Sequence, residues 1–266
     1  MIFGDTHVHS SFSADCSTPM EENVLAAIDK GLPYICLTDH IDYDFPVGDE
    51  VFDFDKAEYF ETIDSLKRKY RDKIRVLAGV ELGMQPHLKV PYEALLKDWP
   101  FDFVIGSQHL VRGNDPYYPE TFEGVSDKEI YRAYFEEMLN NIKQFHGFDA
   151  LGHLDYIIRY GKERRGYRYS EYADLLDEIL KLLLKYNIAV EVNTAGIRKR
   201  LGFPNPQPEV LRRYREMGGT LVTVGSDSHK SYSIGYGFEQ IAALLKSIGF
   251  THIACFEARH HQFIKL

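Results

Sequence analysis

The chain has 266 residues, of which 44% are hydrophobic and 27% charged, so it can bury a large core and does not have the composition of a disordered chain. Its 31 basic and 40 acidic side chains give a net charge of −9, which argues against a broad nucleic-acid or anionic-membrane surface. Three widely spaced cysteines without a CxxC motif, no signal-like N-terminus and no long apolar run favour a reduced, cytoplasmic protein.

One pattern repeats along the chain: a short apolar segment, a turn and then an amphipathic helix. We expect strands at residues 2–9, 34–40, 74–82, 101–109, 150–154, 189–194 and 221–227. Several of these segments are apolar at consecutive positions, which is typical of parallel strands buried on both faces.

Helical signals separate the expected strands. Thr18 and Glu21 have the spacing of a capping box with proline at the first helical position, and Gly31 is expected to end that helix. Ser126 and Glu129 form a second capping box, which opens a helix to about residue 145. Between residues 170 and 187 one helical face carries Leu175, Leu176, Ile179, Leu182, Leu183 and Tyr186. Further helices are expected near 55–70, 91–97, 207–217 and 236–247.

Seven alternating strand–helix units favour an α/β protein whose parallel sheet closes as a single TIM-like (β/α) barrel, in one domain spanning 1–266. An open doubly wound sheet is the structural alternative. It would need a glycine-rich phosphate loop after the first strand, where the chain instead reads THVHSSFSAD. Residues 252–256 resemble a strand, but the pattern gives the tail, 251–266, no place in the barrel.

Chemistry in such barrels collects at the C-terminal ends of the strands, and six of the eleven histidines fall there. His7 and His9 are two apart on one expected strand and therefore share a face. The other four follow later strands, together with two carboxylates: His40, Glu81, His109, His153, Asp227 and His229. The remaining histidines show no such placement: His87, His146, His252, His260 and His261.

This convergence predicts a metal site, because burying so many polar groups without a cation would leave them short of partners. Imidazoles and carboxylates without thiolates suit zinc, manganese or iron. About eight ligands are too many for one ion, so we expect two or three divalent ions that share a bridging carboxylate.

The order of these residues resembles the PHP (polymerase and histidinol phosphatase) family. The resemblance spans residues 7–229, and the segments GDTHVHSSFS, LTDH, GVELG, GSQHL, GHLD and GSDSH are most similar to its histidinol-phosphate phosphatase branch. It implies a distorted seven-stranded (β/α) barrel with a trinuclear metal site.

The resemblance also implies three ligand sets. The first metal would be held by His7, His9, Glu81 and Asp227. Glu81 would bridge to a second metal, which His109 and His153 complete, and the third would be held by Asp15, His40 and His229. Asp39 precedes a ligand and either orients it or caps the turn after the strand.

Two rim loops are basic in this acidic chain: one has Arg159, Lys162, Arg164, Arg165 and Arg168, and the other has Arg198, Lys199 and Arg200. By analogy with the family and by nearness to strand ends, we expect Arg159 and Arg198 to bind phosphate and most of the others to be solvated. Asp115 or Glu120, in the loop after His109, could pair with a substrate ammonium, and a plain loop role is equally open.

The resemblance implies a metal-dependent phosphomonoesterase that hydrolyses L-histidinol phosphate. A metal-bridging hydroxide would attack phosphorus directly, and Asp227 or a metal-held water would protonate the leaving alcohol. The expected partner is this small phosphate ester, with no nucleic-acid polymer and no membrane; the oligomeric state stays open. The alternatives are a phosphoesterase acting on nucleotides or other small phosphate esters, a non-catalytic metal-binding module and, more weakly, an amidohydrolase. The last would predict a strand-end lysine, and the rim offers none.

Overall fold

The computed structural model describes residues 3–46, 51–162 and 167–266. Seven parallel strands form its centre in the order β1-β2-β4-β5-β6-β7-β8, and a short β3 pairs with β4. Their bounds are β1 (Asp5–Val8), β2 (Tyr34–Leu37), β3 (His40–Ile41), β4 (Arg75–Gly83), β5 (Phe103–Ser107), β6 (Ala150–Leu151), β7 (Ala189–Asn193) and β8 (Val222–Gly225). Each predicted strand segment therefore contains a strand, although residue 2 of the first segment lies outside the described residues.

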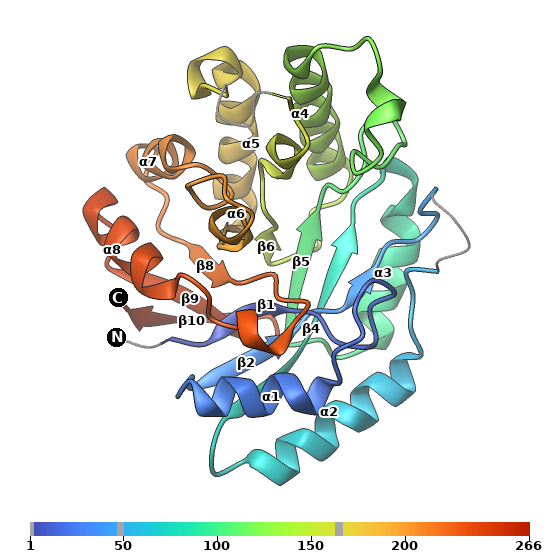
Figure 1. Ribbon diagram of the computed structural model, residues 1–266, viewed down its shortest axis with the longest axis vertical. Coiled ribbons are helices and arrows are strands. Elements are labelled where there is room, and N and C mark those ends of the chain that lie inside the picture. Colours follow the sequence, from blue (N-terminus) through green and yellow to red (C-terminus); the bar gives the residue numbers. More distant parts are fainter. Residues whose placement is uncertain (1–2, 47–50, 163–166) are drawn as a thin grey trace.

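An isolated bridge and side-chain hydrogen bonds close the barrel between β1 and β8. Val8 bridges to Ser228, and the Thr6 hydroxyl donates to the Val224 carbonyl over 3.0 Å. The buried Asp5 carboxylate accepts from the backbone N–H of Ser226 at 2.9 Å. This closure excludes the open doubly wound alternative and confirms the expected (β/α) barrel (Figure 1).

Helices surround the strands, with α1 and α2 along one side and α4 and α5 along the opposite side (Figure 1). Their bounds are α1 (Met20–Asp29), α2 (Lys56–Tyr70), α3 (Lys89–Asp98), α4 (Asp127–Gln144), α5 (Ala173–Tyr186), α6 (Ala195–Arg198), α7 (Pro208–Glu216) and α8 (Phe238–Ile248). Short 3-10 turns occupy η1 (Pro86–Leu88), η2 (Pro119–Phe122), η3 (Tyr156–Arg159), η4 (Tyr169–Glu171) and η5 (Ser231–Ser233). No helix in the described ranges has the length and apolar character needed to cross a membrane.

The two predicted capping boxes have different outcomes. Ser126 and Glu129 cap α4 reciprocally, as predicted. The box at Thr18 is wrong: α1 begins at Met20, and no side chain caps its N-terminus. Thr18 instead donates its hydroxyl to the carbonyl of His229 over 2.9 Å, because the folded chain brings this distant acceptor within reach.

The tail that the sequence left unplaced forms an antiparallel hairpin of β9 (His252–Glu257) and β10 (His260–Lys265). Its apolar residues Ala254 and Phe256 pack in a cluster with residues at the starts of the barrel strands, among them Tyr34 and Phe103. The hairpin therefore covers the N-terminal end of the barrel, opposite the strand ends where the histidines gather.

Arg259 fastens the turn of this hairpin to the barrel. Its Nε donates to the buried Asp149 carboxylate at 2.5 Å and its Nη2 to the Gly147 carbonyl at 2.7 Å. Ala258 and Arg259 both have positive φ, 48° and 64°, a conformation that costs energy in residues other than glycine. The hydrogen bonds of Arg259 offset that cost.

Candidate metal centre

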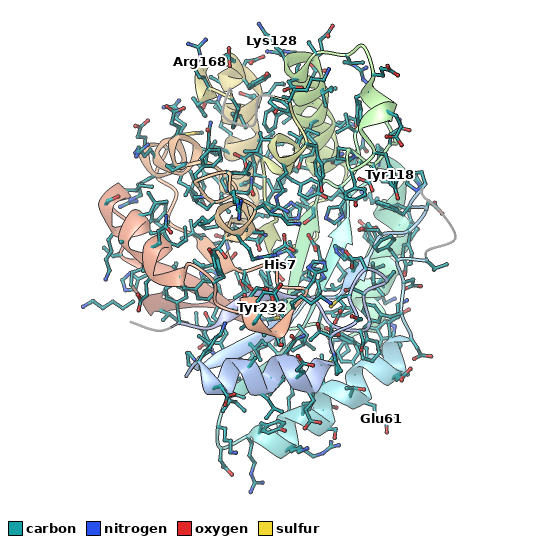
Figure 2. The ribbon with its side chains drawn as sticks, in the orientation of Figure 1. His7, Glu61, Tyr118, Lys128, Arg168 and Tyr232 are labelled. Carbon is teal, nitrogen blue, oxygen red and sulfur yellow. The ribbon has the colours of Figure 1, made fainter. Side chains whose placement is uncertain are left out.

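The predicted histidines meet at the C-terminal end of the strands. His7 is labelled near the middle of the view in Figure 2. His9 stacks between His40 and His229, with ring centroids 4.2 and 4.1 Å apart. Several strands are shorter than predicted, among them β5, which ends at Ser107, and β6, which ends at Leu151. His109 and His153 therefore lie on segments that have already left the sheet.

The buried carboxylate of Glu81, on β4, is the hub of this cluster. Its Oε1 lies 2.9 Å from Nε2 of His153 and 3.2 Å from Nε2 of His109. Its Oε2 lies 3.0 Å from Nε2 of His7, and 3.3 Å from both His9 Nε2 and His40 Nδ1. One carboxylate thus faces five imidazoles, with each oxygen directed at a different subset, which is the arrangement expected of a bridging ligand.

Four overlapping groups offer ligand atoms within 4.8 Å of one another: His7, His9 and Asp227; Glu81, His109 and His153; His9, His40 and His229; and His40, Asp42 and His109. The first group contains three of the four residues that the resemblance implied for the first metal, and the second group matches the set implied for the second. Asp15 lies beside the third, with its Oδ2 3.0 Å from Nε2 of His229 and 3.8 Å from Nε2 of His40. The structure brings together all nine residues that the resemblance implied as ligands.

The donor chemistry fits divalent ions of the transition series. Nε2 of His7 and Nε2 of His9 face each other at 3.0 Å, and both also face Glu81. Nδ1 of His40 is buried and makes no hydrogen bond to the described part of the chain. The nearby thiol of Cys16 points at the carbonyl of His229, 3.2 Å away, and adds no sulfur ligand. Cations shared among these nitrogens and carboxylates would satisfy them together.

The cluster also perturbs its own carboxylates. Burial acts to raise the pKa of Glu81, but its histidine neighbours, His7 first, hold that pKa well below its usual range. In Asp227, burial is likewise outweighed by His7 and then Arg159, so its pKa is lowered. His40 and His229 lower the pKa of Asp15 against the same opposing effect of burial. The site therefore favours ionised carboxylates, the form that ligates metals.

A second layer of acceptors orients the imidazoles, and the sequence analysis did not identify two of its members. Asp42 lies 2.8 Å from Nδ1 of His109, and Glu191 lies 2.5 Å from Nδ1 of His7. Such carboxylate–histidine pairs set the ring orientation and leave the other nitrogen for a metal. The available signal was an acidic side chain inside an apolar strand segment, AVEVN for Glu191.

Asp39 supports a different turn and a different histidine from the two that the sequence left open for it. Its carboxylate accepts from the backbone N–H and hydroxyl groups of Ser10 and Ser13, so it holds the turn after β1. The Ser13 hydroxyl in turn lies 3.1 Å from Nδ1 of His9. Asp39 thus orients His9 through Ser13, rather than the neighbouring His40 directly.

A cavity of about 510 Å³ opens in front of the cluster, and Asp227 and His229 are among the residues that line this cavity. Both predicted phosphate-binding arginines line it, and so does Lys199. Arg159 contacts Asp227 Oδ2 at 3.3 Å, while Arg198 donates to the Asp227 carbonyl at 2.8 Å. The buried Nε of Arg198 has no hydrogen-bond partner among the described residues.

The other basic loop residues lie elsewhere. Lys162, Arg168 and Arg200 are exposed, as expected of solvated side chains, whereas Arg164 and Arg165 lie outside the described residues.

Asp115 lines the cavity, whereas Glu120 is exposed and is not among the described residues that line it. Burial raises the pKa of Asp115 although its contact with the Tyr117 N–H opposes this. Aromatic side chains form much of the remaining wall: Phe45, Phe52, Tyr117, Tyr118, Tyr156 and Tyr160. The cavity therefore offers cations near the histidines and a carboxylate among aromatic rings.

Comparison with known proteins gives consistent matches. The PHP domain family model matches residues 5–195. A probable histidinol-phosphatase of Clostridium acetobutylicum is 40% identical over 241 residues, covering 90% of this chain and 91% of that protein. The histidinol-phosphatase of Lactococcus lactis is 34% identical over 259 residues, covering 95% and 93%. A crystal structure of the Lactococcus lactis histidinol phosphate phosphatase, in complex with zinc, L-histidinol and phosphate, superposes with a TM-score of 0.90 at 30% identity over 98% of both chains.

Proposed function

The chain belongs to the PHP domain family, and from this premise we propose that it is a metal-dependent phosphomonoesterase that converts L-histidinol phosphate to L-histidinol and phosphate. The observation that carries the proposal is its match, over 98% of both chains, to the Lactococcus lactis protein whose crystal structure contains zinc, L-histidinol and phosphate. Such an enzyme acts in histidine biosynthesis, in the cytoplasm. Its partner is a small phosphate ester rather than a nucleic-acid polymer or a membrane, in keeping with the net charge of −9.

We assign two or three divalent ions, zinc, manganese or iron, to the histidine cluster. Nine residues would hold them: His7, His9, Asp15, His40, Glu81, His109, His153, Asp227 and His229. When bound, such ions supply a water nucleophile at neutral pH and neutralise charge on phosphoryl oxygens. Glu81 divides its oxygens between two groups of histidines and would serve as the ligand shared between ions.

Arg159 and Arg198 bind the phosphoryl oxygens from the side of the cavity next to Asp227. Their positive charge offsets the charge that the phosphoryl group carries in the transition state. The Nε of Arg198 supports this role, because this buried donor finds no acceptor in the ranges that the structure describes, and an anion would supply one. Asp227 contacts both this arginine pair and the histidines, and so holds the phosphate-binding and metal-binding groups in one arrangement.

The alcohol portion of the substrate occupies the aromatic part of the cavity. Asp115 pairs with the ammonium, and the tyrosine and phenylalanine rings pack against the flat imidazole. Of the two carboxylates considered in this loop, Asp115 alone lines the cavity in the described structure, so the ammonium is assigned to Asp115 and no longer to Glu120.

The test is a comparison of kcat/KM for L-histidinol phosphate, p-nitrophenyl phosphate and a 3′,5′-bisphosphonucleotide on metal-loaded protein. The aryl phosphate has the better leaving group, so chemistry alone favours it. A higher kcat/KM for histidinol phosphate requires binding energy from the amine and imidazole in the transition state. A preference for the aryl phosphate would reject the histidinol assignment, and a preference for the nucleotide would select the alternative phosphoesterase. No turnover of any ester by metal-loaded protein would favour a non-catalytic module.

Two variants then locate that specificity. Asp115→Asn is expected to narrow the preference for histidinol phosphate over the aryl ester while sparing hydrolysis of the aryl ester. Glu120→Gln makes the same chemical change five residues away, outside the cavity, and is expected to leave the preference as in the wild type. Equal effects of the two substitutions would contradict the assignment of Asp115.

A further inference from the structure

A chain of fully buried polar side chains lies behind the wall of the cavity, on β7. Glu191 accepts from the backbone N–H of His153 at 2.8 Å through the oxygen that does not face His7. That same oxygen accepts from Nδ2 of Asn193 at 3.1 Å. Glu191 and Asn193 are two residues apart on one strand and therefore share a face. A buried carboxylate and a buried amide thus meet directly behind two proposed ligands.

The contact with Glu191 determines how the Asn193 amide is oriented. Because its Nδ2 donates to a carboxylate, its Oδ1 must face the other way, toward Arg159. There it accepts from Nη2 of Arg159 at 3.3 Å and from the backbone N–H of Ala195 at 3.0 Å.

A second amide holds the same guanidinium from the neighbouring loop. Asn205 accepts from Nε of Arg159 at 3.2 Å, while its Nδ2 donates to Asp155 at 2.6 Å. The backbones of Asn193 and Asn205 are bonded in both directions, at 2.8 and 2.9 Å. The two amide oxygens therefore form a rigid bracket along the Nε–Nη2 edge of Arg159.

We propose that Asn193 and Asn205 are positioning residues that set the plane of the Arg159 guanidinium, and that Glu191 ties this bracket to His7. None of the three is among the described residues that line the cavity, so they act through Arg159 and His7 rather than on the substrate. The hydrogen-bonded chain holds the phosphate-binding arginine in fixed relation to the metal-binding histidines. Pre-organisation of this kind lowers the entropy lost when a flexible arginine binds an anion. The proposal rests on the proposed function in one respect, that Arg159 binds phosphate.

The test measures the Kd for inorganic phosphate by calorimetry on metal-loaded protein, together with metal content by elemental analysis. Asn193→Ala is expected to weaken phosphate binding about fivefold or more, because one acceptor that orients the guanidinium is lost. Its metal stoichiometry is expected to stay as in the wild type. Asn205→Ala removes the second acceptor, on the loop side, and is expected to weaken phosphate binding in the same way with unchanged metal stoichiometry. The proposal can therefore still be tested if one of the two variants does not fold.

A double-mutant cycle separates positioning from general damage. In an Arg159→Ala background, Asn193→Ala is expected to have no further effect on phosphate binding, since the group that it orients is absent. Asn141→Ala removes another buried asparagine, which contacts Gln108 and the Met84 carbonyl, and is expected to lower stability without weakening phosphate binding. Three outcomes would each overturn the proposal. They are wild-type phosphate affinity in Asn193→Ala, an equal loss of phosphate affinity on this substitution with and without Arg159, and loss of metal in Asn193→Ala.

Glu191→Gln tests the other end of the chain. It is expected to lower metal affinity by about tenfold or more, because the amide cannot replace both acceptor oxygens. Unchanged metal affinity would reject the link to His7. These readouts use phosphate and metal alone, so they hold even if the physiological ester differs from histidinol phosphate. Failure of the proposed function would instead appear in the substrate comparison on the wild type.

Discussion

Tyr59 allows a sharp test of how the helices support the strand ends beneath the candidate metal centre. It lies on α2, is fully buried, and directs its phenol at two backbone carbonyls, Leu37 at the end of β2 and Gly79 in β4, each at 2.8 Å. These strands lead to His40 and Glu81 respectively. Tyr59→Phe removes one oxygen and leaves the ring packed against its neighbours.

The expected cost follows from the number of protons available. A phenol has one proton, so the two contacts share a single donor and count as one buried hydrogen bond. Its loss is expected to lower the free energy of unfolding by about 1–2 kcal/mol. For a chain of this size, that corresponds to a fall in Tm of about 2–4 °C.

Urea denaturation of metal-loaded protein, followed by circular dichroism, provides the measurement. Tyr232→Phe is the matched control, because this tyrosine is 78% exposed and the same change there is expected to cost less than about 0.5 kcal/mol. Metal stoichiometry is expected to be unchanged in both variants, since neither side chain contacts the cluster in the described structure. The reasoning is refuted if Tyr59→Phe destabilises the protein no more than Tyr232→Phe does.

Four further outcomes are expected. His153→Ala should lower the bound metal measured by elemental analysis and abolish phosphatase turnover; full activity with unchanged stoichiometry would reject it as a ligand. Arg198→Ala should keep its metal but lower kcat/KM at least about tenfold, a loss of roughly 1.4 kcal/mol of transition-state stabilisation. Wild-type kinetics would show that Arg198 is a solvated side chain without a role in phosphate binding. Chelation should lower Tm, and added zinc should restore it, because ions that bind the Glu81 cluster stabilise only the folded state; an unchanged Tm would argue against that cluster as the metal site. Arg259→Ala should lower the free energy of unfolding, measured in urea, by about 1–3 kcal/mol, since it leaves the Asp149 carboxylate without its cation. It should leave kcat/KM unchanged, because the metal-binding cluster lies at the opposite end of the barrel. A lower kcat/KM with intact stability would contradict this.

Local patterns in the sequence were sufficient for much of this architecture. Consecutive apolar positions identified the strands, and the spacing of Ser126 and Glu129 placed the start of α4, because strand burial and helix capping depend on residues a few positions apart. The histidines could be assigned to one rim for a similar reason. In a parallel barrel every strand end faces the same side, so a residue's place relative to its own strand predicts its place in the fold.

The tertiary structure decided the contacts between distant segments. Glu191 contacts His7, which is 184 residues away in the sequence. Thr18 does not cap α1 as predicted but donates to a carbonyl 211 residues away. The tail could be placed only once the open N-terminal end of the barrel existed for it to cover. Such pairings carry no periodicity or spacing along the chain, because the partner of a buried polar group is whichever group the closed barrel brings within hydrogen-bonding distance.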